Sequence, residues 1–277
     1  MAHYKVILAY DGTHFEGFQR QGRARTVQAE VEAALRNLGW QQRTIYAAGR
    51  TDAGVHAAGQ VIGFELEWRH SNQALISALN ANLPPDVAAK QAEIVSPAFH
   101  PRYSALARTY VYRIYTASER DPLRDRYAWR VHSPPVQVSL LREAVSILPG
   151  SHDFSAFGAP PRKGGTTIRR VIRAEWQDRE DELFFSVTAN AFLYHMVRRM
   201  VYLQVLVGQK KLTQQDWQRA VLEAGEAPQG MAPPQGLTLV EILYPDPRKV
   251  DRRLELNDNT LKVSGDDDSG QDVRPEG

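Results

Sequence analysis

The chain of 277 residues contains no cysteine, which excludes disulfide bonds, cysteine metal sites and thiol nucleophiles. It also has no apolar run long enough to span a membrane, and the apolar stretch at its N-terminus is too short for a signal peptide. We therefore expect a cytoplasmic protein. The sequence has no metal-binding histidine motif, no phosphate-binding Gly-Lys loop and no dinucleotide fingerprint, so we expect neither a metal nor another cofactor.

Charge is close to balanced overall, with 34 basic and 32 acidic residues and a net charge of +2. Its distribution is uneven, because residues 251–277 carry eight acidic and four basic side chains, which leaves a net +6 on residues 1–250. A positive body suits a polyanionic partner such as RNA, although an excess of this size is common in other proteins too. The tail lacks aromatic residues and ends in Gly, Ser and Pro, so we expect residues 251–277 to be disordered.

Strand-like and helix-like segments alternate along the rest of the chain. Helices are predicted after the capping residues Thr26, Ser71 and Thr213, the last with Asp216 as the acidic half of a capping box. Two further helices are predicted over residues 140–148 and 194–207. Strands are predicted at 4–10, 43–48, 60–66, 87–94, 106–116, 167–176, 183–188 and 237–243. Hairpin-like pairs among them favour an α+β fold with mixed, largely antiparallel sheets flanked by helices. We predict one half over 1–105 and a second over 106–250.

The run Gly49-Arg50-Thr51-Asp52-Ala53-Gly54-Val55-His56-Ala57 is the most informative part of the sequence. Its glycines allow a sharp turn and a close approach by a ligand. The guanidinium of Arg50 lies two residues from Asp52 and favours the charged form of that carboxylate. Asp52 is therefore a candidate nucleophile. Asp and Gly also form ordinary turns, so the short pattern alone does not decide the matter.

Three other stretches suggest a site. In the loop after Tyr10-Asp11-Gly12-Thr13, Arg20, Arg23 and Arg25 are either phosphate contacts or an exposed basic loop. A phosphatase nucleophile would require Asp where Ala9 stands, which excludes that function. In Arg108-Thr109-Tyr110-Val111-Tyr112-Arg113-Ile114-Tyr115, strand alternation places Tyr110, Tyr112 and Ile114 on one face. In the predicted helix at 194–207, His195, Arg198, Arg199 and Tyr202 would form one polar stripe.

Together these strings resemble the TruA family of tRNA pseudouridine synthases. The resemblance rests on the Asp52 run, on Tyr10 to Gln28, on Phe99 to Tyr110 and on Asn190 to Met200, and it spans about residues 4–244. Phe18, Arg199 and Tyr202 depart from the residues usual in the family. The resemblance implies two similar halves around a basic cleft, with Asp52 on the floor of that cleft.

The resemblance also implies specific roles. The enzyme would act on uridine at positions 38–40 of the tRNA anticodon stem-loop, as a homodimer and without a cofactor. Tyr110 would contact the flipped base, Arg198 would pair with Asp52, and Arg50 and His195 would bind substrate. Two alternatives remain. A carboxylate-based glycosidase would normally need two carboxylates, and the motif supplies one. A non-catalytic RNA-binding module would explain the basic loops but not the Asp-Arg loop.

Overall fold

The structure is a computed structural model that describes residues 1–162 and 164–245. The acidic tail at 251–277 lies outside the described residues. Within the described ranges, no helix is both long enough and apolar enough to cross a bilayer.

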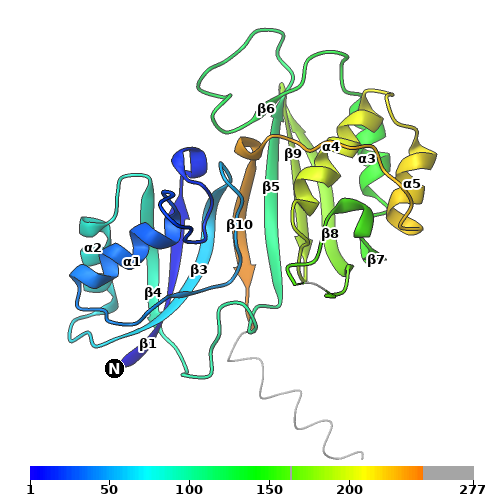
Figure 1. Ribbon diagram of the computed structural model, residues 1–277. Helices are drawn as coiled ribbons and strands as arrows, with labels where there is room; N and C mark the ends of the chain where they lie inside the picture. Colours follow the sequence, from blue (N-terminus) through cyan, green and yellow to red (C-terminus); the bar gives the residue numbers. More distant parts are fainter. Residues whose placement is uncertain (163, 246–277) are drawn as a thin grey trace, which may run out of the picture. The chain divides into compact units, whose positions relative to one another are not determined.

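One mixed sheet of ten strands runs through the described chain (Figure 1). Eight strands follow each other in the order β4-β1-β3-β10-β5-β9-β8-β7, while β2 pairs with β3 and β6 pairs with β5. Their bounds are β1 Ala2–Tyr10, β2 Tyr46–Ala47, β3 His56–Leu66, β4 Val87–Ile94, β5 Ala107–Tyr115, β6 Trp129–Arg130, β7 Gly150–Asp153, β8 Ile168–Arg179, β9 Glu182–Ala189 and β10 Leu237–Leu243. Only the β10–β3 and β5–β6 pairs are parallel. The expected mixed, largely antiparallel architecture is confirmed, and the strands of both predicted halves join in a single sheet.

The last strand, β10, lies in the middle of this sheet, between β3 and β5 (Figure 1). It runs parallel to β3 and antiparallel to β5. Gly59 of β3 permits this arrangement, because a Cβ atom added there would lie 2.3 Å from the carbonyl oxygen of Val240. The strand therefore joins segments of the chain that are far apart in sequence.

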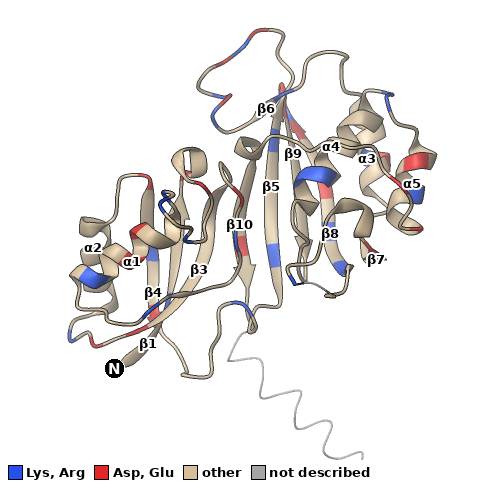
Figure 2. Ribbon diagram, viewed as in Figure 1, with Lys and Arg blue, Asp and Glu red and all other residues tan. Residues whose placement is uncertain are grey.

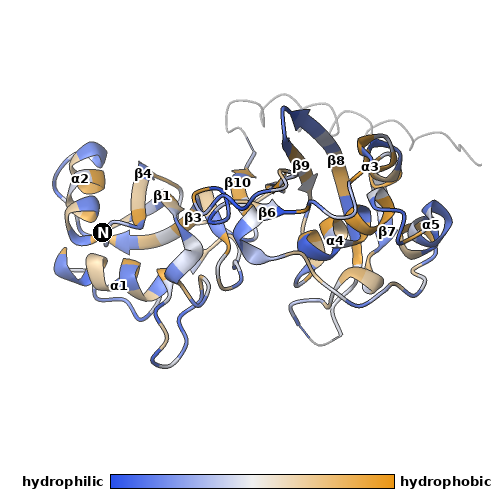
Figure 3. Cartoon of the chain, turned by 90° about the horizontal axis from the view of Figure 1, so that it is seen from above, coloured by the Kyte–Doolittle hydropathy of each residue, from blue (hydrophilic) through white to orange (hydrophobic). Residues whose placement is uncertain are grey.

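Within the described part of the chain, five α-helices flank the sheet, with α1 and α2 at its β4–β1 end and α3, α4 and α5 at its β8–β7 end (Figures 1 and 3). They span α1 Val27–Asn37, α2 Asn72–Asn82, α3 Val138–Val145, α4 Met196–Gly208 and α5 Gln214–Leu222, with short 3₁₀ turns at Gly12–His14, Ser155–Phe157 and Pro234–Gly236. The predicted cap at Ser71 and the capping box at Thr213 are confirmed, since each hydroxyl accepts a hydrogen bond from a first-turn amide. Thr26 occupies the N-cap position of α1 without a side-chain cap bond.

The apolar side chains form two clusters beneath these helices. One includes Val31 of α1 and Phe64 of β3, and the other includes Met200 of α4 and Trp217 of α5. The side chain of Tyr110 packs against both clusters. The middle of the sheet, where β10 and β5 run side by side, is therefore the junction between the two cores.

Candidate active site

Asp52 lies on the loop between β2 and β3, which is fastened on several sides. The Thr51 hydroxyl makes a hydrogen bond of 2.8 Å with the hydroxyl of Tyr10, and the Thr51 carbonyl accepts one from the Phe18 amide at 3.1 Å. The amide of Gly54, a residue with φ of +75°, donates to the carbonyl of Phe15. The aromatic residues of the Tyr10-to-Gln21 string therefore hold the Asp52 loop in place. Phe18, which departs from the usual family residue, is buried against Tyr10.

Arg198 of α4 makes the main contact with the Asp52 carboxylate. Its Nη1 lies 3.2 Å from Asp52 Oδ2, while its Nε donates to the carbonyl of Ala232 at 2.8 Å. The Arg198 side chain is only 10% exposed, whereas that of Asp52 is 30% exposed. Within the described residues, Oδ1 of Asp52 accepts no hydrogen bond. One carboxylate oxygen is thus held by the protein and the other is left for a ligand.

The position of His195 shows that the predicted start of the helix was wrong. The helix begins at Met196, not at 194, and His195 precedes it with φ of +64° in the left-handed region. His195 Nε2 lies 3.6 Å from Asp52 Oδ2. Arg198 is buried, so the polar stripe expected from His195 to Tyr202 is wrong. The helix instead directs Arg198 inward to Asp52, while Arg199 donates to the carbonyls of Ala156, Pro228 and Gly230.

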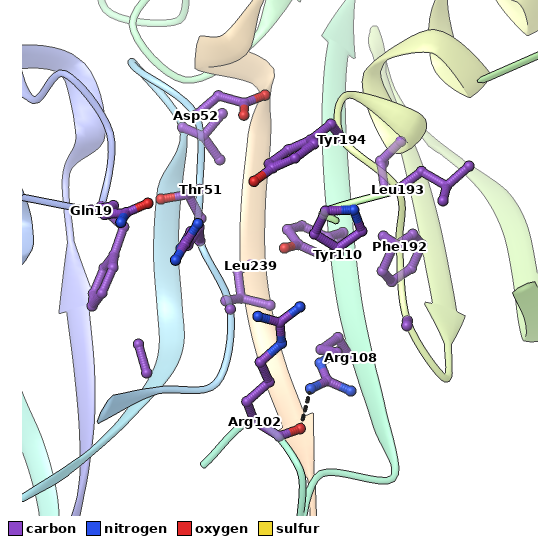
Figure 4. A pocket seen from close by; sticks show the side chains of 18 of the residues that line it. Gln19, Thr51, Asp52, Arg102, Arg108, Tyr110, Phe192, Leu193, Tyr194 and Leu239 are labelled. Atoms are coloured by element: carbon purple, nitrogen blue, oxygen red, sulfur yellow. Dashed lines mark hydrogen bonds between the residues drawn. The ribbon is translucent and has the colours of Figure 1, made fainter. Parts of the chain in front are cut away.

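A pocket of about 560 Å³ opens above the middle of the sheet, and Asp52, Arg50, Tyr110, His195 and Arg198 all line it. Its described lining holds five arginines, namely Arg50, Arg102, Arg108, Arg169 and Arg198, and Asp52 as the one carboxylate. Figure 2 shows basic segments on β5, β8 and α4, the elements that supply three of these arginines. In Figure 4, Asp52 lies at one end, Arg102 and Arg108 lie at the other, and Tyr110 lies between them. Such a lining suits a polyanionic ligand that is bound by the arginines and meets a single carboxylate, Asp52.

Tyr110 lies on β5 and contacts the pocket through a ring set edge-on to Phe192, with centroids 5.1 Å apart. Burial raises the pKa of its phenol to about 12; the positive charge of Arg108 opposes this shift and the negative charge of Asp52 adds to it. The phenol is therefore neutral at physiological pH. It offers an aromatic surface and a hydroxyl to a bound ligand.

Comparison with known proteins is decisive for the family. A family model described as tRNA pseudouridine synthase matches residues 6–104 and 144–245. The tRNA pseudouridine synthase A of Geobacillus kaustophilus is 39% identical over 246 residues, which cover 87% of this chain and 94% of that protein. The protein of the same name from Geobacter sulfurreducens is 39% identical over 241 residues, covering 87% and 98%, and one from Coxiella burnetii is 37% identical over 255 residues, covering 91% and 97%.

The chain belongs to the tRNA pseudouridine synthase family. The resemblance carried by the sequence motifs is thereby confirmed.

His56 ends the family motif but lies outside the pocket lining. Its Nδ1 accepts a hydrogen bond from the Gly12 amide at 3.0 Å, and its Nε2 lies 3.1 Å from the carbonyl oxygen of Gln235. This pattern assigns the ring proton to Nε2. Burial lowers the pKa of His56, and the attraction of the nearby Asp11 carboxylate opposes that shift. In this member of the family, His56 ties the start of β3 to the turn after β1.

The predicted basic loop is not brought to the pocket, since none of Arg20, Arg23 and Arg25 lines it. Arg20 pairs with the buried Glu32, and Arg25 donates two hydrogen bonds to Asp86, at 2.7 and 2.9 Å. Two of the three arginines therefore have carboxylate partners within the protein, and their role in RNA binding stays a prediction.

Three arginines of the pocket were not predicted as site residues. Arg108 donates to the carbonyls of Ala48, Arg102 and Asn190, and so ties the Asp52 loop to β5. Arg169 is buried, and its Nε has no partner among the described residues. Arg108 stands two residues before Tyr110 on one strand, so alternation would have placed both on one face. No local signal identified Arg102 or Arg169.

Proposed function

We propose that the protein isomerises uridine to pseudouridine at positions 38–40 of the tRNA anticodon stem-loop, in the cytoplasm, with Asp52 as nucleophile and without a cofactor. The observation that carries this proposal is the state of Asp52 in an arginine-lined pocket. Arg198 holds Oδ2 and leaves Oδ1 free of protein hydrogen bonds within the described residues. An oriented carboxylate with one free oxygen is what a nucleophilic attack requires.

The reaction is an isomerisation in which one bond to the ribose replaces another. The bond between N1 of uracil and C1′ of ribose breaks, and a bond between C5 and C1′ replaces it. C5 loses a proton and N1 gains one, so no atom or electron enters or leaves. Asp52 attacks C6 of the base or C1′ of the ribose, or first removes a ribose proton, and each route begins at the same carboxylate. The target base must leave the RNA stack to reach it.

The remaining site residues support this chemistry. Tyr110 provides a ring against which the detached base rotates, and its neutral phenol can donate a hydrogen bond to the base. Arg198 fixes the direction of the carboxylate. Arg50 is exposed on the same loop as Asp52, within reach of the RNA backbone or of the space left by the flipped base. His195, 3.6 Å from Oδ2, contributes to the substrate-facing surface.

A glycosidase is less well supported. Hydrolysis of an anomeric bond normally employs two carboxylates that flank it. Asp52 is the single carboxylate among the described residues of the pocket lining. Incubation with an unmodified tRNA transcript separates the possibilities, because a glycosidase releases uracil, a synthase forms pseudouridine, and a binding module forms no product.

The test of the nucleophile is Asp52→Asn, which keeps the shape of the side chain and removes the reactive carboxylate. Pseudouridine formation should fall to the limit of detection, whereas tRNA affinity should change little because phosphate contacts dominate it. Asp178→Asn is a matched control, since Asp178 is an exposed aspartate paired with Arg142 and lies outside the pocket lining. Substantial turnover by folded Asp52→Asn would place the nucleophile elsewhere.

We further propose that the working unit is a homodimer in which one tRNA contacts both chains. The proposal extends the family resemblance, and it matches the geometry of a compact chain against an elongated tRNA; the mass of one chain is 31.2 kDa. Analytical ultracentrifugation at micromolar concentration should give twice this mass, and a monomer throughout would contradict the proposal.

A further inference from the structure

Three aromatic rings that line the pocket contact each other in series, each tilted against the next. The ring centroids of Tyr46 and His100 are 5.1 Å apart, and those of His100 and Tyr103 are 4.4 Å apart with an interplanar angle of 33°. Tyr46 belongs to β2, and the other two residues belong to the loop between β4 and β5. We call Tyr46, His100 and Tyr103 the aromatic ladder.

Two of the three ladder rings are largely exposed to solvent. Tyr103 is 67% exposed and Tyr46 is 49% exposed, yet all three rings line the same pocket as Asp52. Burial in the core therefore does not account for the stack. Aromatic rings at the edge of a positively charged groove are the usual means by which proteins hold unstacked bases.

The loop that carries His100 and Tyr103 is held by hydrogen bonds to its backbone. His100 Nδ1 lies 3.1 Å from the amide of Arg102 and 3.4 Å from that of Tyr103, and both amides donate to it. The Ser104 amide donates to the His100 carbonyl, and Arg108 donates to that of Arg102. Burial lowers the pKa of His100, with the charge of Arg102 acting in the same direction, so the ring is neutral at physiological pH. A hydrogen-bonded loop that presents a neutral His100 ring beside the Tyr103 ring offers a surface on which a base can stack.

We propose that the aromatic ladder is a second nucleobase subsite, in which Tyr103 stacks on an unpaired base of the same RNA. The proposal rests on the proposed function. Arg102, next to Tyr103 in the chain, lies at the opposite end of the pocket from Asp52, so the ladder serves a nucleotide other than the target uridine (Figure 4). Arg162, which donates to the Tyr103 hydroxyl at 3.2 Å, and Arg102 supply positive charge for the adjoining backbone.

Replacement of Tyr103 separates stacking from its other contacts. Tyr103→Leu keeps an apolar side chain without a ring, whereas Tyr103→Phe keeps the ring and loses only the hydroxyl bound by Arg162. Binding of an unmodified tRNA transcript should weaken by about fivefold or more in Tyr103→Leu, the lower end of what one base–aromatic stack provides, and should be near normal in Tyr103→Phe. Thermal melting should match the wild type in both variants, because the side chain is exposed.

Salt dependence gives a second readout. The slope of log affinity against log salt concentration should stay unchanged in Tyr103→Leu, because stacking neutralises no phosphate. Loss of a phosphate contact would instead reduce the slope by about 0.7 to 0.9. A reduced slope, wild-type affinity of Tyr103→Leu, or failure of Tyr103→Phe to bind normally would each overturn the proposal.

The base itself can be located by a cycle of RNA and protein changes. Transcripts with a single abasic nucleotide at each unpaired position are tested against wild type and Tyr103→Leu. One position should weaken binding by wild type and leave binding by Tyr103→Leu unaffected, because the two changes remove the same contact. If every abasic transcript penalises both proteins equally, no base stacks on Tyr103. Failure of wild type to form pseudouridine would count against the proposed function alone, since these measurements record binding.

Discussion

Arg198 orients the Asp52 carboxylate and also bonds to the buried carbonyl of Ala232, and Arg198→Met tests both roles. Methionine keeps much of the apolar stem while it removes the Nη1 contact to Asp52 and the Nε bond to Ala232. A hydrogen bond to a charged group is worth about 1.5–3 kcal/mol. Asp52 is 30% exposed, so water compensates in part and the lower value applies. Because about 1.4 kcal/mol corresponds to a factor of ten, kcat/KM for pseudouridine formation should fall at least about tenfold.

The stability cost has a different origin. Ala232 is fully buried, and its carbonyl loses the guanidinium that bonds to it, which costs about 1–3 kcal/mol. For a chain of this size that corresponds to a fall in Tm of about 2–4 °C for each kcal/mol. Differential scanning calorimetry measures this loss, and initial rates measured well below the Tm of the variant keep it apart from the loss of turnover.

Arg199→Met provides the matched control. Arg199 follows Arg198 on α4, donates to three carbonyls and makes no hydrogen bond to Asp52. This variant should lose comparable stability and retain turnover per folded molecule. If Arg198→Met lost no more turnover than Arg199→Met, Arg198 would be a structural tie and the assignment to Asp52 would fail.

Two further predictions concern His56 and Gly59, which position β3 and do not line the pocket. Burial lowers the pKa of His56 in the folded state, so below about pH 6.5 the unfolded chain binds more protons than the folded one and stability falls as the pH falls. His56→Asn should therefore make the urea midpoint depend less on pH between 7.5 and 5; His100, whose pKa is also lowered, adds an effect of the same sign in both proteins, and an unchanged dependence would show that His56 does not contribute. Gly59→Ala should lower the free energy of unfolding by about 1–3 kcal/mol in urea titration, because the new Cβ meets the Val240 carbonyl, whereas Ala58→Ser at an exposed neighbouring position should change it little.

Local signals in the sequence predicted much of the fold. The strands β1, β4, β5 and β10 lie within two residues of their predicted positions, because alternation and β-branched composition are properties of each segment alone. The box of Thr213 and Asp216 likewise depends on neighbours in the sequence. The two-residue strand β6 carries no periodicity and was not predicted, whereas the equally short β2 lies within the strand predicted at 43–48.

The start of α4 was mispredicted for a tertiary reason. The amide of Tyr194 donates to the carbonyl of Ala159 and His195 adopts a positive φ, so the chain turns before the helix can begin. Helical spacing could not reveal this, since neither partner lies within the helix. Arg198 is buried and directed to Asp52, where spacing alone had placed it on a solvated face.

The pairing of Asp52 with Arg198 depends on a feature that no local pattern encodes. Asp52 precedes β3, and Arg198 is held by the carbonyl of Ala232, a few residues before β10. Because β10 lies between β3 and β5, it brings the loop before β3 and the segment before β10 to the same end of the sheet. Leu237 belongs to one core and Leu239 to the other, and both line the pocket. The strand that joins the two cores therefore also sets the distance between the nucleophile and its guanidinium, and packing defects along β10 should impair turnover even where no site residue has changed.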